Sequence, residues 1–208
     1  MKNEKHLRPS SGYVMLFVLF ILLVVMIGGV IFFRNPLFLI MAPFLLLFMR
    51  GFFTVNPNGS KVMVLFGSYK GTVRENGFFW ANPFYTRQRI SLRARNFDSE
   101  RVKVNDKIGN PILINVILVW QVEDTYKSAF DVDNYEEFVR VQTDAAVRKL
   151  AGSYPYDNFD DEQAELTLRS GMDEVNEALE TEITERLSIA GIKVMEARIG
   201  YLAYAPEI

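Results

Sequence analysis

Side chains that commonly perform catalysis are scarce in this sequence of 208 residues, which has no cysteine and a single histidine, His6. Without cysteine, a thiol nucleophile, a disulfide framework and a thiolate metal site are excluded. A zinc site would have to consist of carboxylates alone, which is uncommon. His6 lies in the N-terminal tail, and an apolar segment separates it from the rest of the chain. We interpret it as a disordered tail residue rather than a metal ligand or a member of a catalytic triad.

Acidic side chains occur in adjacent pairs, which is what a carboxylate-based hydrolase would need. The pairs are Glu136-Glu137, Asp160-Asp161 and Asp173-Glu174. Acidic residues are also favoured at helix N-termini by the helix dipole, and this effect explains most of the pairs. The sequence contains no phosphate-binding loop, nucleophile elbow or metal signature. It therefore predicts no catalytic residue, no cofactor and no metal site.

Four arginines recur at alternate positions in the segment "RQRISLRARNF": Arg87, Arg89, Arg93 and Arg95. A β-strand has a period of two residues, so a strand through this segment would place all four guanidinium groups on one face. These four residues are our candidate oligomer interface.

Charge is unevenly distributed along the chain. The net charge is +6 from Thr54 to Trp120 and −12 from Gln121 to Ala190. A solvated surface is the usual explanation of such runs, but the segregation also suits a head-to-tail ring in which a basic face meets an acidic one. Anionic lipid headgroups are another candidate partner for the arginine face. Nucleic acid is not an expected partner, because the whole chain has a net charge of −2.

The N-terminal quarter has the composition of a membrane anchor, residues 13–53, preceded by a basic tail, residues 1–12. Residues 13–33 contain no charge, and as a helix they would cover about 31 Å, roughly the hydrocarbon thickness of a bilayer. This run is longer than the apolar core of a signal peptide, and no small-residue cleavage site follows it. It also lacks the polar face of a helix in a soluble protein. We predict a transmembrane helix.

A second apolar segment, residues 37–53, follows the turn "RNP" and contains Pro43, which we expect to kink it. The two segments predict a helical hairpin, either crossing twice or re-entrant. Three Lys and Arg residues precede the first segment and one lies in the connection, so the N-terminus is expected in the cytoplasm. A hairpin would return the chain to that side, whereas a single crossing would leave the following domain outside. We favour the cytoplasmic side.

The turn-rich stretch "ENGFFWANPF" carries four aromatic residues close to the predicted anchor. Trp and Phe are suited to the depth of lipid headgroups, although rings in a turn can also pack on a sheet. We expect some rings to lie in the core and others to reach the headgroups. The candidate membrane-interface residues are Arg50, Phe52, Phe53, Phe78, Phe79 and Trp80.

Residues 54–205 have the composition of a globular domain whose hydrophobic period changes along the chain. Alternating segments predict antiparallel strands, including a long strand over Ile112–Val122. Helical periodicity then appears twice, with Asp133 as the N-cap of one helix and a capping box from Ser170 for the other. Strand alternation returns after Gly191. The expected fold is α+β, with a mostly antiparallel sheet and two helices.

Four segments of this domain occur in a specific order and spacing. They are the glycine-punctuated hairpin over 64–84, "VNDKIGNPI" with the following "VWQVED", "FDVDNYEEFVRVQTDAAVRKLAGSYPYD" and "AGIKVMEARIGYLAYAPEI". Together they resemble the SPFH (band 7) domain of stomatins, prohibitins and flotillins, and specifically a bacterial stomatin-like branch.

The resemblance implies a non-enzymatic scaffold in the bacterial inner membrane. Such a scaffold would assemble into a homo-oligomeric ring or cage and would organise membrane microdomains or enclose membrane proteins. The alternative that it implies is a regulatory accessory subunit of an ATP-dependent membrane protease. In the family a long helix follows the domain, and we interpret residues 206–208 as the start of a truncated C-terminal helix.

Overall fold

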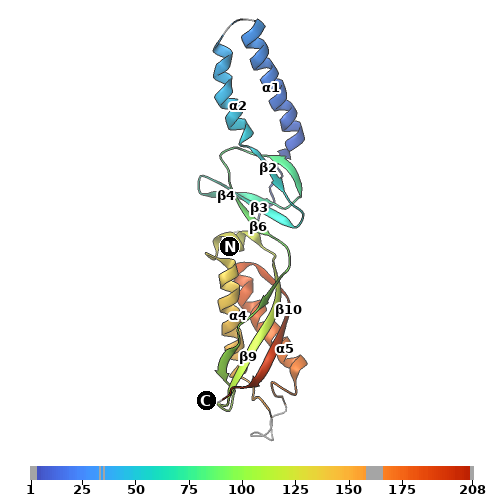
Figure 1. Ribbon diagram of the computed structural model, residues 1–208, viewed down its shortest axis with the longest axis vertical. Coiled ribbons are helices and arrows are strands. Elements are labelled where there is room, and N and C mark those ends of the chain that lie inside the picture. The colour runs from blue at the N-terminus through green and yellow to red at the C-terminus, as the bar shows by residue number, and fades with distance from the viewer. Residues whose placement is uncertain (1–3, 33, 35, 158–165, 207–208) are drawn as a thin grey trace. The chain divides into compact units, whose positions relative to one another are not determined.

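The computed structural model describes residues 4–32, 34, 36–157 and 166–206 of the chain (Figure 1). It divides into two compact units, Met1–Ser91 and Leu92–Ile208. Two sequence predictions fall wholly or largely outside the described residues: the acidic pair Asp160-Asp161, and the start of a C-terminal helix at 206–208.

The first unit contains two apolar helical segments that lie side by side (Figure 1). Helix α1 spans Gly12–Phe32, and the short 3-10 helix η1, Pro36–Ile40, leads into α2, Met41–Met49. The segments approach closely at Gly29, where the ring of Phe38 leaves no room for a Cβ atom. The second apolar segment, predicted over residues 37–53, is helical only as far as Met49, and its last residues enter a β-strand.

Two three-stranded antiparallel sheets complete the first unit, with strand orders β1-β5-β2 and β4-β3-β6. One buried cluster joins them, formed mainly by Phe53, Val55, Met63 and Val73. The strands are β1 (Ser10–Ser11), β2 (Phe52–Val55), β3 (Gly59–Leu65), β4 (Ser68–Val73), β5 (Gly77–Trp80) and β6 (Thr86–Ser91).

The N-terminal segment around His6 pairs with a strand, so the interpretation of His6 as a disordered tail residue was wrong. His6 forms a parallel bridge with Thr72 of β4, and the Leu7 amide donates to the Thr72 carbonyl at 3.0 Å. Leu7 also packs against the buried cluster. At the same edge, Glu4 and Arg74 form a bidentate ion pair, at 2.6 and 2.8 Å. The segment is held because it satisfies the free backbone groups of an edge strand.

The second unit packs helices on one face of an antiparallel sheet, as expected for an α+β fold. The long strand β9 (Pro111–Val122) pairs on one side with β10 and on the other with β7 and β8. The other elements are β7 (Arg95–Asp98), β8 (Val102–Asn105), α3 (Thr125–Phe130), α4 (Tyr135–Ala151), α5 (Met172–Leu187), η2 (Ser188–Ala190) and β10 (Ile192–Tyr204).

The core of this unit follows the periods of its elements. Alternate residues of β9 are buried, and β9 packs against α4, while β10 packs against α5. Helix α5 contributes one apolar stripe at helical spacing, all of it fully buried, as the sequence predicts. Its residues are Val175, Leu179, Ile183 and Leu187.

Both predicted helix caps were wrong. Helix α4 is capped by Asn134, one residue after Asp133, and the Asn134 side chain accepts from the amides of Glu136 and Glu137. Helix α5 has Gly171 at its N-cap without a side-chain bond, because the Ser170 hydroxyl bonds to Thr167 instead. The short helix α3, which we did not predict, is capped by Asp124.

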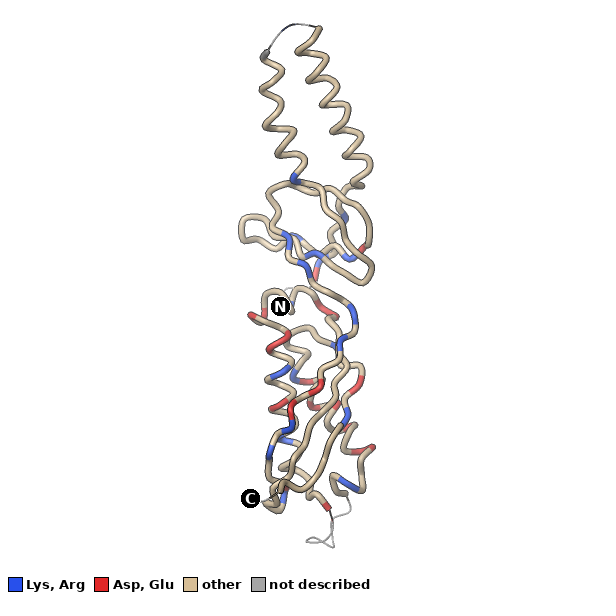
Figure 2. Tube along the Cα trace, viewed as in Figure 1, with Lys and Arg blue, Asp and Glu red and all other residues tan. Residues whose placement is uncertain are grey.

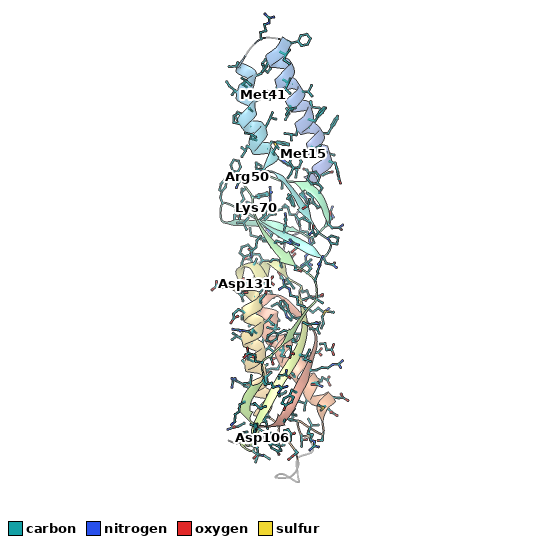
Figure 3. All side chains as sticks on the ribbon, viewed as in Figure 1. Met15, Met41, Arg50, Lys70, Asp106 and Asp131 are labelled. Atoms are coloured by element: carbon teal, nitrogen blue, oxygen red, sulfur yellow. The ribbon has the colours of Figure 1, made fainter. Side chains whose placement is uncertain are left out.

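Asp106 holds together the turn between β8 and β9 (Figure 3). Its Oδ1 atom accepts from the amides of Ile108, Gly109 and Asn110 at 2.7–3.0 Å, and its Oδ2 atom accepts from the amide of Tyr156 at 3.0 Å. Burial alone would raise the pKa of Asp106, but these four backbone bonds outweigh it and hold the pKa below the ordinary value. The carboxylate therefore stabilises the fold only while it is ionised.

We expect Asp106→Asn to lower the free energy of unfolding at about pH 7 by roughly 1–3 kcal/mol, because four backbone amides lose a charged acceptor. Since the folded-state pKa is depressed, the stabilisation is complete above the unfolded value, about 3.9, and is lost as pH falls through the folded value. Urea unfolding of the detergent-solubilised chain at about pH 7 and about pH 3 should show a weaker pH dependence in the variant. The exposed Asp131→Asn serves as the control, and an unchanged pH dependence in Asp106→Asn would contradict this account.

Candidate functional site

Strand alternation divides the predicted membrane-interface aromatics between two faces of one sheet. In the antiparallel pair β2–β5, Phe52 lies opposite Trp80, and Phe53 lies opposite Phe79. Phe53 and Phe79 face the buried cluster, with ring centroids 5.9 Å apart. Phe52, Phe78 and Trp80 lie on the other face.

That other face meets the ends of the two apolar helices through a set of rings that we call the aromatic layer: Tyr13, Phe48, Phe52, Phe78 and Trp80. Phe48 stacks on Trp80 at 4.6 Å, Phe52 stacks on Phe78 at 5.4 Å, and Tyr13 meets Phe78 edge-on at 5.4 Å. The Trp80 indole N–H donates to the Phe48 carbonyl at 2.9 Å. The layer thus joins the first turn of α1 and the last turn of α2 to the sheet.

The structure therefore brings the predicted aromatics into one region but gives them different surroundings. Tyr13 and Phe48 belong to the same layer, and sequence reasoning missed them. The sequence did contain a signal for them. Tyr13 begins the first apolar segment and Phe48 lies near the end of the second, and aromatic residues are enriched at such ends of membrane helices.

Arg87 lies at the junction where α2 becomes β2. Its Nη1 atom donates to the carbonyl of Phe52 at 3.2 Å, and its Nη2 atom donates to the carbonyls of Arg50 and Gly51 at 3.0 Å. Its guanidinium also lies 4.9 Å from the centre of the Phe53 ring. The Arg50 carbonyl, at the C-cap of α2, has no partner within the helix, so this cation satisfies it and complements the helix dipole.

Arg87 is one of four cations around this junction, with Arg50, Lys61 and Arg89. Burial lowers the pKa of Arg87, and the charge of Arg50 lowers it further. Burial likewise lowers the pKa of Lys61, with added effects of Arg87 and Arg89. Among the described residues no carboxylate forms an ion pair with any of the four, so this cationic cluster lacks counter-charges from the protein.

The predicted single face of arginines does not exist, because no strand runs from Arg87 to Arg95. Strand β6 ends at Ser91, opposite the first residue of β3, and Arg95 begins β7, which pairs with β9 in the second unit. In that unit, Arg95 forms an ion pair with Glu136. The exposed Arg93 lies between the strands. The four arginines therefore do not lie on one strand face, and whether any of them contacts another subunit stays a prediction.

Charge separates by unit (Figure 2). The first unit has ten Lys and Arg against two Asp and Glu, a net charge of +8, and the second has thirteen against twenty-three, a net charge of −10. The acidic pairs Glu136-Glu137 and Asp173-Glu174 lie in the first turns of α4 and α5, where the helix dipole favours them. Among the described residues, no group of His, Asp and Glu is arranged to hold a metal ion.

Residues 53–208 match the family model of the SPFH domain / Band 7 family. The chain belongs to this family. No curated protein matches it. The Band 7 region begins within β2, directly after the apolar helices, and includes strands of both units. Band 7 proteins are generally membrane-associated scaffolds without enzymatic activity. In this Band 7 protein, the aromatic layer and the cationic cluster lie where the family region meets the apolar helices.

Arg87→Lys keeps the positive charge but replaces the planar fork, whose two Nη atoms reach three carbonyls, with a single nitrogen atom on a shorter side chain. We expect it to lower the free energy of unfolding by about 1.5–3 kcal/mol, whereas Arg89→Lys on the same strand should cost less than about 0.5 kcal/mol. Denaturant unfolding in detergent, followed by Trp80 fluorescence in a Trp120→Phe background, measures the difference. Equal losses in the two variants would show that the carbonyl bonds of Arg87 do not stabilise the junction.

Proposed function

We propose that this protein is an oligomeric scaffold, anchored in a membrane by its two apolar helical segments, that organises membrane microdomains or encloses membrane proteins. The observation that carries the proposal is the surface of α1. Its 21 residues include no charge, and only 6% of an 18-residue stretch within it is buried. A helix of this length and composition is matched to a bilayer, and so much exposed apolar surface is unfavourable in water.

The pairing of the strands around the helices supports a hairpin anchor. Strand β1 directly precedes α1, β2 closely follows α2, and both pair with β5. A single crossing would place β1 and β2 on opposite sides of the bilayer and break this sheet. Residues Leu37–Met49 are short for a span, so a re-entrant arm and a second crossing both remain compatible with the proposal. Together with the positive-inside rule, this pairing supports the proposal that the Band 7 domain lies on the cytoplasmic side, in the inner membrane of a bacterial cell.

Self-association is supported by the charges of the two units. A chain whose parts carry net charges of +8 and −10 can bind copies of itself head to tail, with unlike charges facing each other. The acidic part includes a groove of about 680 Å³ between α5 and β10, lined by Glu177, Glu180 and Glu185 among others. No feature of the described residues specifically favours the protease-subunit alternative, which stays a prediction.

We expect the full chain to stay in the membrane pellet after alkaline carbonate washing. After detergent extraction it should elute from size exclusion well above the size of a 23.9 kDa monomer with its micelle. Raising NaCl from about 0.1 M to about 1 M shortens the Debye length from about 10 Å to about 3 Å and should shift the protein toward smaller species.

Charge reversal on α5 tests the acidic face directly. Glu177→Lys with Glu185→Lys changes two exposed side chains that form no ion pair among the described residues, so the fold should tolerate it. The oligomer should weaken, whereas the paired control Glu177→Asp with Glu185→Asp should assemble as the wild type does. A monomer at every salt concentration, or full-length chain in the aqueous fraction, would contradict the scaffold proposal.

A further inference from the structure

A cavity of about 530 Å³ lies beside the last turn of α2, entirely within the first unit. Its walls combine two kinds of side chain. Arg50, at the end of α2 (Figure 3), and Arg87 supply positive charge, while Leu47, Phe84 and Tyr85 supply apolar surface.

The positive charge in this cavity is not neutralised by the described part of the chain. The Arg50 side chain is exposed, and neither Arg50 nor Arg87 forms an ion pair with a described carboxylate. The Nη atoms of Arg87 bond to backbone carbonyls, so its guanidinium is fixed in place, and its Nε atom is buried without a hydrogen-bond partner. Arg50 repels the adjacent and partly buried Arg87, and an anion entering between the two cations would relieve that cost.

The apolar surroundings favour a lipid over a free anion. Leu47 belongs to the apolar helix α2, so one wall of the cavity continues a surface suited to acyl chains. Phe84 is 54% exposed, and it packs at 6.1 Å against Phe66, which is 84% exposed. Phe66 occupies the turn between β3 and β4 in the left-handed region, with φ 47°, where a bulky side chain is uncommon. Two exposed aromatic rings beside paired arginines are suited to the headgroup layer of a membrane.

We propose that this cavity binds the phosphate of an anionic phospholipid. Arg50, whose guanidinium has no other described partner, donates hydrogen bonds to the phosphate, and Arg87 contributes a fixed positive charge. Leu47 and Phe84 contact the glycerol and the first carbons of the acyl chains. The inference rests on the proposed membrane anchoring, because the cavity meets a lipid only if α2 lies in a bilayer. It assigns Arg87 to a lipid site rather than to the oligomer interface predicted from its sequence.

The test uses the full chain in detergent micelles, with native mass spectrometry to count bound lipids during titration with phosphatidylglycerol, phosphatidylcholine or inorganic phosphate. The wild type should bind one phosphatidylglycerol more tightly than phosphatidylcholine. Arg50→Gln should weaken that binding about tenfold, the loss expected for a charge-assisted contact. Arg89→Gln, an equal change of charge on the same strand as Arg87 but outside the cavity, should bind as the wild type does. Arg50→Lys should recover part of the affinity.

Three results would overturn the proposal. Arg50→Gln could bind as the wild type does, or both Gln variants could lose affinity equally, which would indicate attraction by overall charge. Inorganic phosphate could displace phosphatidylglycerol at equal concentration, which would indicate a site for the free anion. Carbonate washing of membranes separates these results from failure of the anchoring. If Arg50→Gln remains in the pellet while the lipid titration fails, only the lipid site is refuted; if the wild type itself is released, the proposed function is refuted first.

Discussion

Strand β5 sets the main constraint on the N-terminal unit, because it pairs on one side with β1 and on the other with β2. These two strands flank the apolar helical segments, so the chain must leave the sheet and return to the same sheet. The aromatic layer fills the space between the helix ends and the sheet, and Arg87 bonds the carbonyls where α2 gives way to β2. The apolar helices and the sheet are therefore joined by backbone pairing and packed rings.

Positive charge gathers at this junction, and negative charge gathers in the second unit. The cationic cluster has no described counter-charge, whereas the second unit carries a large acidic excess. Basic side chains at the end of an apolar helix suit an anionic headgroup layer, and an acidic surface outside it would be repelled by the same lipids. In the proposed function, one charge pattern would orient the chain at a membrane and leave the acidic unit available to neighbouring copies. Both effects follow from electrostatics that act beyond single contacts.

Local periodicity made much of the fold predictable, but long-range pairing did not follow from it. The uncharged helix, the long strand β9 and the buried stripe of α5 repeat at helix or strand spacing, so the sequence contains them directly. The arginine alternation was misleading, because a strand lasts only as long as its partner, and β6 stops where β3 begins. The pairing of His6 with Thr72 joins positions 66 residues apart, and no local pattern reports it. Successive side chains of a strand point to opposite faces, so Phe52 and Phe53 face opposite ways. This could be predicted only after β2 was known to be a strand.

Depth in the bilayer is the most direct test of the proposed anchoring, under which Trp80, stacked on Phe48 of the apolar helix α2, lies close to the lipid. The chain has two tryptophans, Trp80 in the layer and Trp120 in the core of the second unit, so each can be isolated by changing the other to Phe. The single-tryptophan proteins would be reconstituted in lipids with or without bromine on their acyl chains. The account predicts strong quenching of Trp80 and little quenching of Trp120. Equal quenching of the two, or no quenching of Trp80, would contradict it.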